Sequence, residues 1–294
     1  MTVIESNNRH AAHNRQALEQ FKTLAASLDG WDFSTERDGV KLYSKTVPGA
    51  TIPIVRGDII FKTTDYTVKD VASVATLPGC RKIWDEKYDV SEVKELFTVY
   101  ESLFWVKLKA PWPVSSRDFA ATSLRDINDD ECYVVMSSVE DSQIPPVSGC
   151  VRGDLKISGW KIYQVEGGVG VTYITQVDLA GSIPSSFLKN VQLQVPLCAG
   201  KVVEYIKKHG FPPTTLTCTA VYKSESFNHD KREHVVEVDG QGEVSWLVSG
   251  TMYPNGVKVN VSGQGQPEIV DEGKNRKVIL RNVNGPATLK ITKA

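Results

Sequence analysis

Residues 182–209, SIPSSFLKNVQLQVPLCAGKVVEYIKKH, decide the fold of this chain. Apolar side chains recur there every three or four residues, which predicts one stripe along a helix: Phe187, Leu188, Val191, Val195, Cys198, Val202 and Ile206. Ser182 is a suitable N-cap, and Gly210 can adopt the left-handed conformation that ends a helix. Such a helix is about 40 Å long, enough to cross a small domain. Because Pro196 removes a backbone hydrogen bond, we expect a bend there.

The sequence before this helix reads mainly as strands. A helix is expected over 7–29, then a hairpin turning at Asp38-Gly39 and a strand over 52–61. Two short helices (66–75 and 77–84) and six strand-like runs up to Asp178 follow. In one of these runs, apolar side chains from Phe104 to Leu108 share a face, and the opposite face should end in water at Lys107 and Lys109. The pattern predicts an α+β fold in which a curved antiparallel sheet surrounds the long helix.

The sequence pattern changes after Gly210. Residues 211–214 contain Pro212-Pro213 and are expected to form a stiff linker. Seven strand-like runs follow without a helical pattern, and turn pairs such as Asn255-Gly256 separate them. We therefore expect a domain over 1–210 and a small all-β sandwich over 215–294.

Composition narrows the classes of function. Lys and Arg (34) balance Asp and Glu (35), which argues against nucleic acid as the main partner. The sequence shows no signal-peptide core and no apolar run long enough to cross a membrane, so a cytoplasmic location is expected. The five cysteines lack CxxC spacing, and all five histidines lie outside residues 14–208. We expect reduced thiols, no metal site, no cofactor and no catalytic nucleophile.

Several short motifs resemble the START family of lipid-transfer domains, and they occur in the family's order. They are CRKIWD (80–85), PWPVSSRDF (111–119), GCVR (149–152), SGWKI (158–162) and YITQVDLAGSIP (173–184), followed by the long helix. The resemblance covers about residues 8–209. It implies a helix-grip fold with an apolar tunnel that holds one lipid, exchanged at membranes through transient peripheral contact and without chemistry. Since these motifs end near His209, residues 1–210 are expected to hold lipid on their own.

The resemblance also suggests which residues contact the lipid. Arg81 and Asp85 are similar to the pair in the phosphatidylcholine-transfer branch, where the arginine meets the lipid phosphate. The same spacing on a helix also fits a solvated surface ion pair. Further head-group positions fall on Val106, Phe119, Lys156, Ser158 and Gln176, and the apolar lining is expected from Phe104, Leu108 and the helix residues Phe187, Val191, Val195, Cys198 and Val202. Because Val106 has no π face, choline specificity is not predicted.

Alternatives remain open on the sequence alone. A glycerophospholipid is favoured, whereas a carboxylate and an arginine such as Asp85 and Arg81 also suit a sterol. A cyclase or dehydratase of the wider helix-grip superfamily would use the same fold, and a lipid-sensing adaptor would use the sandwich to recruit a partner. Arg117-Asp118 is expected to fix a loop end and to have no catalytic role. The sandwich faintly resembles GOLD-type domains, and its protein partner is unknown.

Overall fold

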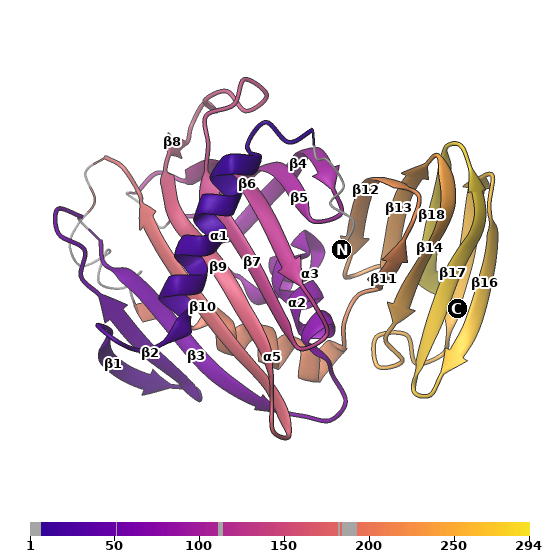
Figure 1. Cartoon of the computed structure of the whole chain (residues 1–294), viewed down its shortest axis with the longest axis horizontal. Coiled ribbons are helices and arrows are strands. Elements are labelled where there is room, and N and C mark those ends of the chain that lie inside the picture. The colour runs from indigo at the N-terminus through magenta and orange to yellow at the C-terminus, as the bar shows by residue number, and fades with distance from the viewer. Residues whose placement is uncertain (1–6, 51, 111–113, 182, 184–192) are drawn as a thin grey trace. The chain divides into compact units, whose positions relative to one another are not determined.

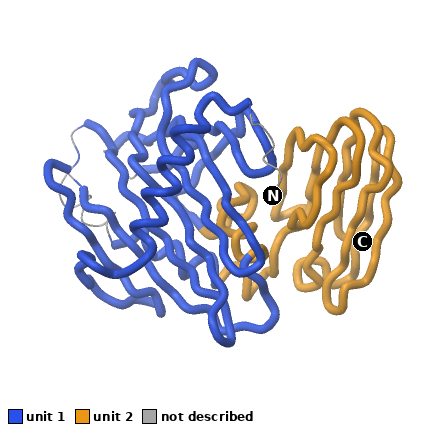
Figure 2. The backbone as a smooth tube through the Cα atoms, in the orientation of Figure 1, with its two compact units in different colours: residues 1–68, 85–203 blue, residues 69–84, 204–294 orange. Residues whose placement is uncertain are grey.

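The computed structural model describes residues 7–50, 52–110, 114–181, 183 and 193–294. The chain forms two compact units, coloured separately in Figure 2. Unit 1 comprises residues 1–68 and 85–203, and unit 2 comprises residues 69–84 and 204–294. Residues 69–84 therefore belong with the end of the chain. The expected boundary near residue 210 stays a prediction.

Unit 1 is built on a ten-stranded sheet within the part of the chain that the structure describes (Figure 1). The strand order is β1-β2-β3-β10-β9-β7-β6-β5-β4, every pair on this path is antiparallel, and β8 adds to β6 in parallel. The elements are α1 (Ala11–Ala26), β1 (Asp32–Arg37), β2 (Val40–Lys45), β3 (Ile54–Lys62), β4 (Tyr88–Thr98), β5 (Glu101–Leu108), β6 (Arg117–Ile127), β7 (Glu131–Ser138), β8 (Val151–Arg152), β9 (Asp154–Val165) and β10 (Gly168–Asp178). The α+β class with a large antiparallel sheet is confirmed.

The first hairpin follows from its turn residues. Asp38 and Gly39 both have positive φ angles, 52° and 76°, as a two-residue type I′ turn requires. Such a turn matches the right-handed twist of the strands that it joins. β1 and β2 consequently pair directly from Arg37↔Val40 outward, at one edge of the sheet.

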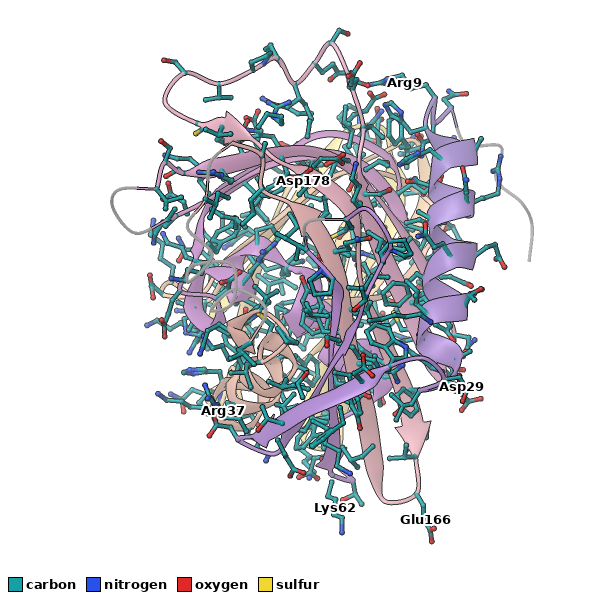
Figure 3. The ribbon with its side chains drawn as sticks, turned by 90° about the vertical axis from the view of Figure 1, so that its left-hand side faces the viewer. Arg9, Asp29, Arg37, Lys62, Glu166 and Asp178 are labelled. Carbon is teal, nitrogen blue, oxygen red and sulfur yellow. The ribbon has the colours of Figure 1, made fainter. Side chains whose placement is uncertain are left out.

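Helix α1 covers one face of the sheet. Leu18, Phe21 and Ala25 lie on one side of the helix and pack on strand residues Ile54, Val135, Ile157 and Ile174. Arg9 and Asp29 lie beyond the two ends of the helix in Figure 3, and Figure 1 shows that α1 runs across the strands. The spacing of apolar residues in this helix therefore predicts its buried face correctly.

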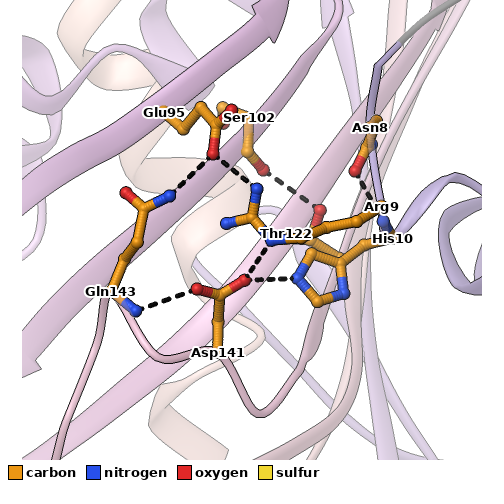
Figure 4. A network of polar contacts seen from close by, with 8 residues as sticks. All are labelled: Asn8, Arg9, His10, Glu95, Ser102, Thr122, Asp141 and Gln143. Carbon is orange, nitrogen blue, oxygen red and sulfur yellow. Dashed lines mark hydrogen bonds and ion pairs between the residues drawn. The ribbon is translucent and has the colours of Figure 1, made fainter.

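A polar network ties the segment before α1 to the 139–147 segment (Figure 4). The Arg9 side chain donates hydrogen bonds to Asp141 and Glu95, each at 2.6 Å. His10 Nε2 lies 2.8 Å from the same Asp141 oxygen, and the backbone N–H of Gln143 donates to the other at 2.9 Å. The charge of Asp141 is thereby compensated, although its side chain is only 3% exposed.

The second face of β5 differs from expectation. Lys109 is exposed and Lys107 pairs with Asp89 at 3.0 Å, so the end of the strand meets water as expected. Leu103 is fully buried, however, and packs with Ile144 of the 139–147 segment. The sequence does not predict that residues 139–147 cover this face of β5, because they have no regular spacing of apolar residues.

Unit 2 combines short helices with two four-stranded sheets, and all of its residues are described. The sheet orders are β11-β14-β17-β16 and β12-β13-β18-β15, all antiparallel. The elements are α2 (Val68–Thr76), α3 (Pro78–Trp84), β11 (Thr214–Cys218), β12 (Val221–Asn228), β13 (Glu233–Asp239), β14 (Gln241–Val248), β15 (Val257–Gly263), β16 (Gln266–Glu272), β17 (Asn275–Asn284) and β18 (Ala287–Lys293). The expected small all-β part after residue 214 is confirmed.

The expected long helix is interrupted within the described residues, because residues 193–194 are helical and a bend and turn separate them from helix α5. Helix α5 spans Cys198–His209 and ends at Gly210, whose φ is +72° and whose N–H donates to Ile206 O at 2.8 Å. Residues 195–197 form a bend and turn before it, as Pro196 led us to expect. Phe187 and Val191 lie outside the described residues.

No helix in the described part of the chain is both long enough and apolar enough to span a bilayer.

Candidate functional site

The sheet face opposite α1 carries an apolar cluster in unit 1. Val106 on β5 and Phe119 on β6 pair across the strands and are 5% and 2% exposed. Tyr88 on β4 completes the buried centre, and Phe104, Leu108, Leu155, Val177 and Leu179 pack around it. Four residues expected to line the lipid site, Phe104, Val106, Leu108 and Phe119, therefore come together here.

The same face continues across the sheet with a hydroxyl pair. The register Val134↔Trp160 and Trp160↔Tyr173 puts these side chains on the face that holds Phe119. Tyr173 and Trp160 have ring centroids 4.4 Å apart, and the Tyr173 hydroxyl lies 3.0 Å from Ser158 Oγ. Tyr173 was not predicted as a site residue, although its alternation with Val171 and Thr175 was a usable signal.

The segment leading into α5 lies against this face at β2 and β3. A Cβ added to Gly57 would lie 2.2 Å from Pro196 O, and one added to Gly200 would lie 2.8 Å from a Val40 methyl carbon. The first approach is backbone against backbone, which only glycine permits. Of the expected helix residues, Val202 is fully buried, whereas Val195 and Cys198 are partly buried.

Two expected head-group residues lie elsewhere. Gln176 pairs with Ile157 in the register and so lies on the α1 side, where its Nε2 donates to Ile52 O at 3.3 Å. Lys156 is the extra residue of a β-bulge, because Gln176 faces Ile157 while Val177 faces Leu155. The bulge turns Lys156 to solvent, where it pairs with Asp154 and is 52% exposed. A regular strand pattern does not reveal this bulge.

Arg81 and Asp85 belong to different units. Arg81 lies on α3 in unit 2, is partly buried, and has its guanidinium 6.0 Å from the centre of the Trp84 ring. Asp85 follows the last helical residue, belongs to unit 1 and is 8% exposed. Its Oδ1 accepts a hydrogen bond from the Lys87 backbone at 3.0 Å. Helix α3 ends at Trp84, as the expected range 77–84 has it, and Asp85 is the next residue.

Arg117 and Asp118 fix chain segments, as their place in the sequence suggested. Arg117 donates to the carbonyls of Leu179, Ala180 and Ser115 at 2.8, 3.0 and 2.5 Å. Asp118 accepts hydrogen bonds from Trp105 Nε1 and Arg152 at 2.9 and 2.8 Å. Both residues thus hold the ends of β6 and of the 179–180 segment in place.

The buried thiols are held in their neutral form. Burial raises the pKa of Cys80 to about 12 and that of Cys132 to about 12, well above the usual range near 8.5. A thiol is a poor nucleophile compared with its thiolate. Among the described residues, His, Cys, Asp and Glu form no group of three that would hold a metal ion.

This architecture, an open antiparallel sheet with a helix over its apolar face, defines the helix-grip class of folds. The START domain family model matches residues 13–209, and the chain belongs to that family. An uncharacterized protein of Pseudomonas aeruginosa is 27% identical over 179 residues, which cover 58% of this chain and 84% of that protein.

Solved structures agree on the fold. Human StAR-related lipid transfer protein 5 superposes with a TM-score of 0.60 at 20% identity, over 67% of this chain and 96% of that chain. A fragment of the STAR-related lipid transfer protein from Xanthomonas axonopodis gives a TM-score of 0.51 at 27% identity, over 60% of this chain and 97% of the fragment. The helix-grip fold expected from the motifs is confirmed.

Proposed function

We propose that this protein binds one lipid and transfers it between membranes without chemical change. The observation that carries the proposal is the apolar cluster of Phe104, Val106, Leu108 and Phe119 on the face opposite α1. Family membership supports it, as does the likeness to a bacterial protein named as a lipid transfer protein. Such a surface gains about 0.8 kcal/mol for each lipid methylene that it takes from water. In exchange with a bilayer this gain largely cancels, so polar groups must select the lipid.

The favoured ligand is a glycerophospholipid, with Arg81 as its phosphate anchor. A guanidinium binds phosphate through two parallel hydrogen bonds, which a lysine cannot reproduce. Arg81 is partly buried next to Trp84, so water competes less with the phosphate for its guanidinium. We propose that the protein works in the cytoplasm and touches membranes transiently.

A sterol is the second candidate, and one contact favours it. The hydroxyls of Ser158 and Tyr173, 3.0 Å apart, form a neutral polar pair on the apolar face. Such a pair can exchange hydrogen bonds with the single hydroxyl of a sterol.

The state of the side chains supports a non-enzymatic role. Cys80 and Cys132, both fully buried, are kept as neutral thiols. Arg117 and Asp118, the charged pair in the motif PWPVSSRDF, are already engaged in structural hydrogen bonds. We therefore propose binding and release, with no covalent step.

The test is lipid extraction from liposomes by the purified full-length chain, followed by mass spectrometry of the bound lipid. One chemically unchanged lipid per chain is expected. A Val106→Asp variant, which introduces a charge into the apolar cluster, should lose extraction, whereas Glu140→Gln on the exposed surface should keep it. Recovery of a hydrolysed or cyclised product would contradict the proposal.

A further inference from the structure

Helix α3 is seated on the sandwich of unit 2 by a backbone contact. A Cβ added to Gly79 would lie 1.9 Å from the carbonyl oxygen of Phe227 and 2.8 Å from its carbonyl carbon. Phe227 lies on β12 and is 7% exposed. No side chain fits between the two segments, so the first turn of α3 rests directly on this strand.

A second contact joins α3 to the last turns of α5 and to the sandwich. Cys80, the residue after Gly79, is fully buried, and the Tyr205 side chain lies close enough to act on the pKa of its thiol. The Tyr205 hydroxyl lies 2.6 Å from His229 Nδ1, just after β12. The ring of His209 completes the group, with its centroid 4.8 Å from that of His229. Helix α3, helix α5 and the sandwich thus share one polar and aromatic cluster.

The segment expected to be a linker also belongs to this packing. Phe211 is fully buried, and residues 210–213 are all buried. A Cβ at Gly210 would lie 2.4 Å from Ser249 Oγ and 3.1 Å from the backbone nitrogen of Met252. Residues 210–213 therefore pack against the sandwich and do not form a flexible linker.

These contacts matter because α3 is too short to be stable as an isolated helix. It spans Pro78–Trp84, and isolated helices shorter than about 12 residues are marginal in water. Its position is set by its neighbours, which are β12, Tyr205 and helix α2, where Trp84 Nε1 donates to Val74 O at 3.0 Å. Arg81 lies on this helix, two residues after Gly79.

We infer that the sandwich is a positioning part of the lipid site, because it fixes the helix that carries Arg81. The inference rests on the proposed role of Arg81 as phosphate anchor. It assigns Gly79, Tyr205 and His229 as positioning residues that act through Arg81. It also reverses the expectation that residues 211–294 are dispensable for holding lipid.

The experiment uses the full chain and compares Gly79→Ala with Gly265→Ala. Alanine at 79 meets the backbone oxygen of Phe227, whereas at 265 it meets the Leu280 side chain on β17. Binding of phosphatidylcholine is measured with liposomes, in wild-type and Arg81→Ala backgrounds. Hydrogen exchange of the α3 amides is followed without lipid.

Tyr205→Phe, which removes one oxygen, is a milder variant. Tyr222→Phe is its control, because the Tyr222 hydroxyl forms a hydrogen bond with Thr215 within the sandwich.

Gly79→Ala should weaken phosphatidylcholine binding roughly tenfold to a hundredfold, since a displacement of about 1 Å can cost that much. In the Arg81→Ala background the same change should cost less than about twofold, because the two changes act through one contact. Exchange of the α3 amides should accelerate in Gly79→Ala and Tyr205→Phe and stay unchanged in the two controls.

Three outcomes would contradict either the positioning role of the sandwich or the proposed lipid-binding function. If the wild type binds lipid and Gly79→Ala binds as Gly265→Ala does, the positioning role is wrong and the proposed function stands. If the losses from Gly79→Ala and Arg81→Ala simply multiply, the sandwich does not act through Arg81. If the wild type extracts no lipid, the proposed function is wrong, and the exchange measurement still decides whether the sandwich holds α3.

Discussion

The ring of Phe21 on α1 fills the space above Gly159 on β9. A Cβ added to Gly159 would lie 2.7 Å from Phe21 Cε2 and 2.5 Å from Val134 O. Phe21 is fully buried, at the centre of the cluster that joins α1 to the sheet. This glycine thus sets how closely the helix approaches the strands.

Gly159→Ala should destabilise unit 1 by about 1–3 kcal/mol, because a methyl group there overpacks the contact between Phe21 and the sheet. Urea denaturation followed by circular dichroism measures this loss. Gly200→Ala is the control, since its added Cβ would lie 2.8 Å from a Val40 methyl carbon and no closer than 3.9 Å to the Asp38 backbone oxygen, and alanine favours the helix. Equal stability of the two variants would contradict the prediction.

Arg81→Ala should weaken phospholipid binding about tenfold to a few hundredfold, because hydrogen bonds to charged groups contribute about 1.5–3 kcal/mol. Arg81→Lys should recover only part of that affinity, since a point charge replaces a fork. Sterol binding should fall by about 1 kcal/mol or less. Paired titrations with phosphatidylcholine and cholesterol vesicles distinguish these cases.

Lys82→Ala, on the exposed side of α3, is the matched control and should bind as the wild type does. An equal loss for both lipids, or no loss for phospholipid, would remove Arg81 as the phosphate anchor. Binding would then rest on other polar groups, of which the Ser158–Tyr173 pair is the first to test.

Asp141→Asn should lower the free energy of unfolding by about 1–3 kcal/mol, because it removes a charged acceptor from Arg9 and the Gln143 backbone. The Arg9 guanidinium holds the pKa of Asp141 well below its usual range. This contribution is therefore full at neutral pH and is lost only as pH falls below the usual carboxyl range near 4. Glu140→Gln, next to it and exposed, should change stability by less than about 0.5 kcal/mol in the same denaturation assay.

Unit 2 should lose stability as pH falls from about 6.5 towards 4. Burial lowers the pKa of His234 to about 3, and burial with the nearby Arg232 charge lowers that of His229 to about 4. Burial also lowers the pKa of His209, next to Lys208 and Arg232. In this pH window the histidines of the unfolded chain bind protons, whereas those of the folded unit stay neutral. The free energy of unfolding therefore decreases as the pH falls.

Thermal unfolding at half-unit pH steps measures this trend. His234→Gln removes the group that is fully buried and should flatten the curve between pH 6.5 and 5. A melting temperature that is independent of pH over that range would show that these histidines titrate normally in the folded protein.

The alternation of apolar residues predicts most strands, because β3, β4, β5, β6, β7, β9 and β10 each place side chains under α1 or in the opposite cluster. The resemblance to the family put Lys156 and Gln176 at the lipid head group, and it could not show that Lys156 is the extra residue of a bulge on β9 or that Gln176 on β10 lies on the α1 side. Alternation also gives no information on distant contacts: α3 packs on β12, more than a hundred positions later in the sequence. Nothing local in CRKIWD indicates such a distant partner.

The grouping of residues 69–84 with residues 204–294 has a consequence for how the chain matures on the ribosome. Helix α3 is made early, whereas β12, on which Gly79 rests, emerges only after the whole sheet of unit 1. Synthesis proceeds at about 5–20 residues per second, so α3 waits for several seconds with its buried face uncovered. During that interval Cys80 and Trp84 are exposed to chaperones and to oxidants that cannot reach them in the finished protein. Variants that slow translation between residues 84 and 221 should therefore lower yield without changing the purified product.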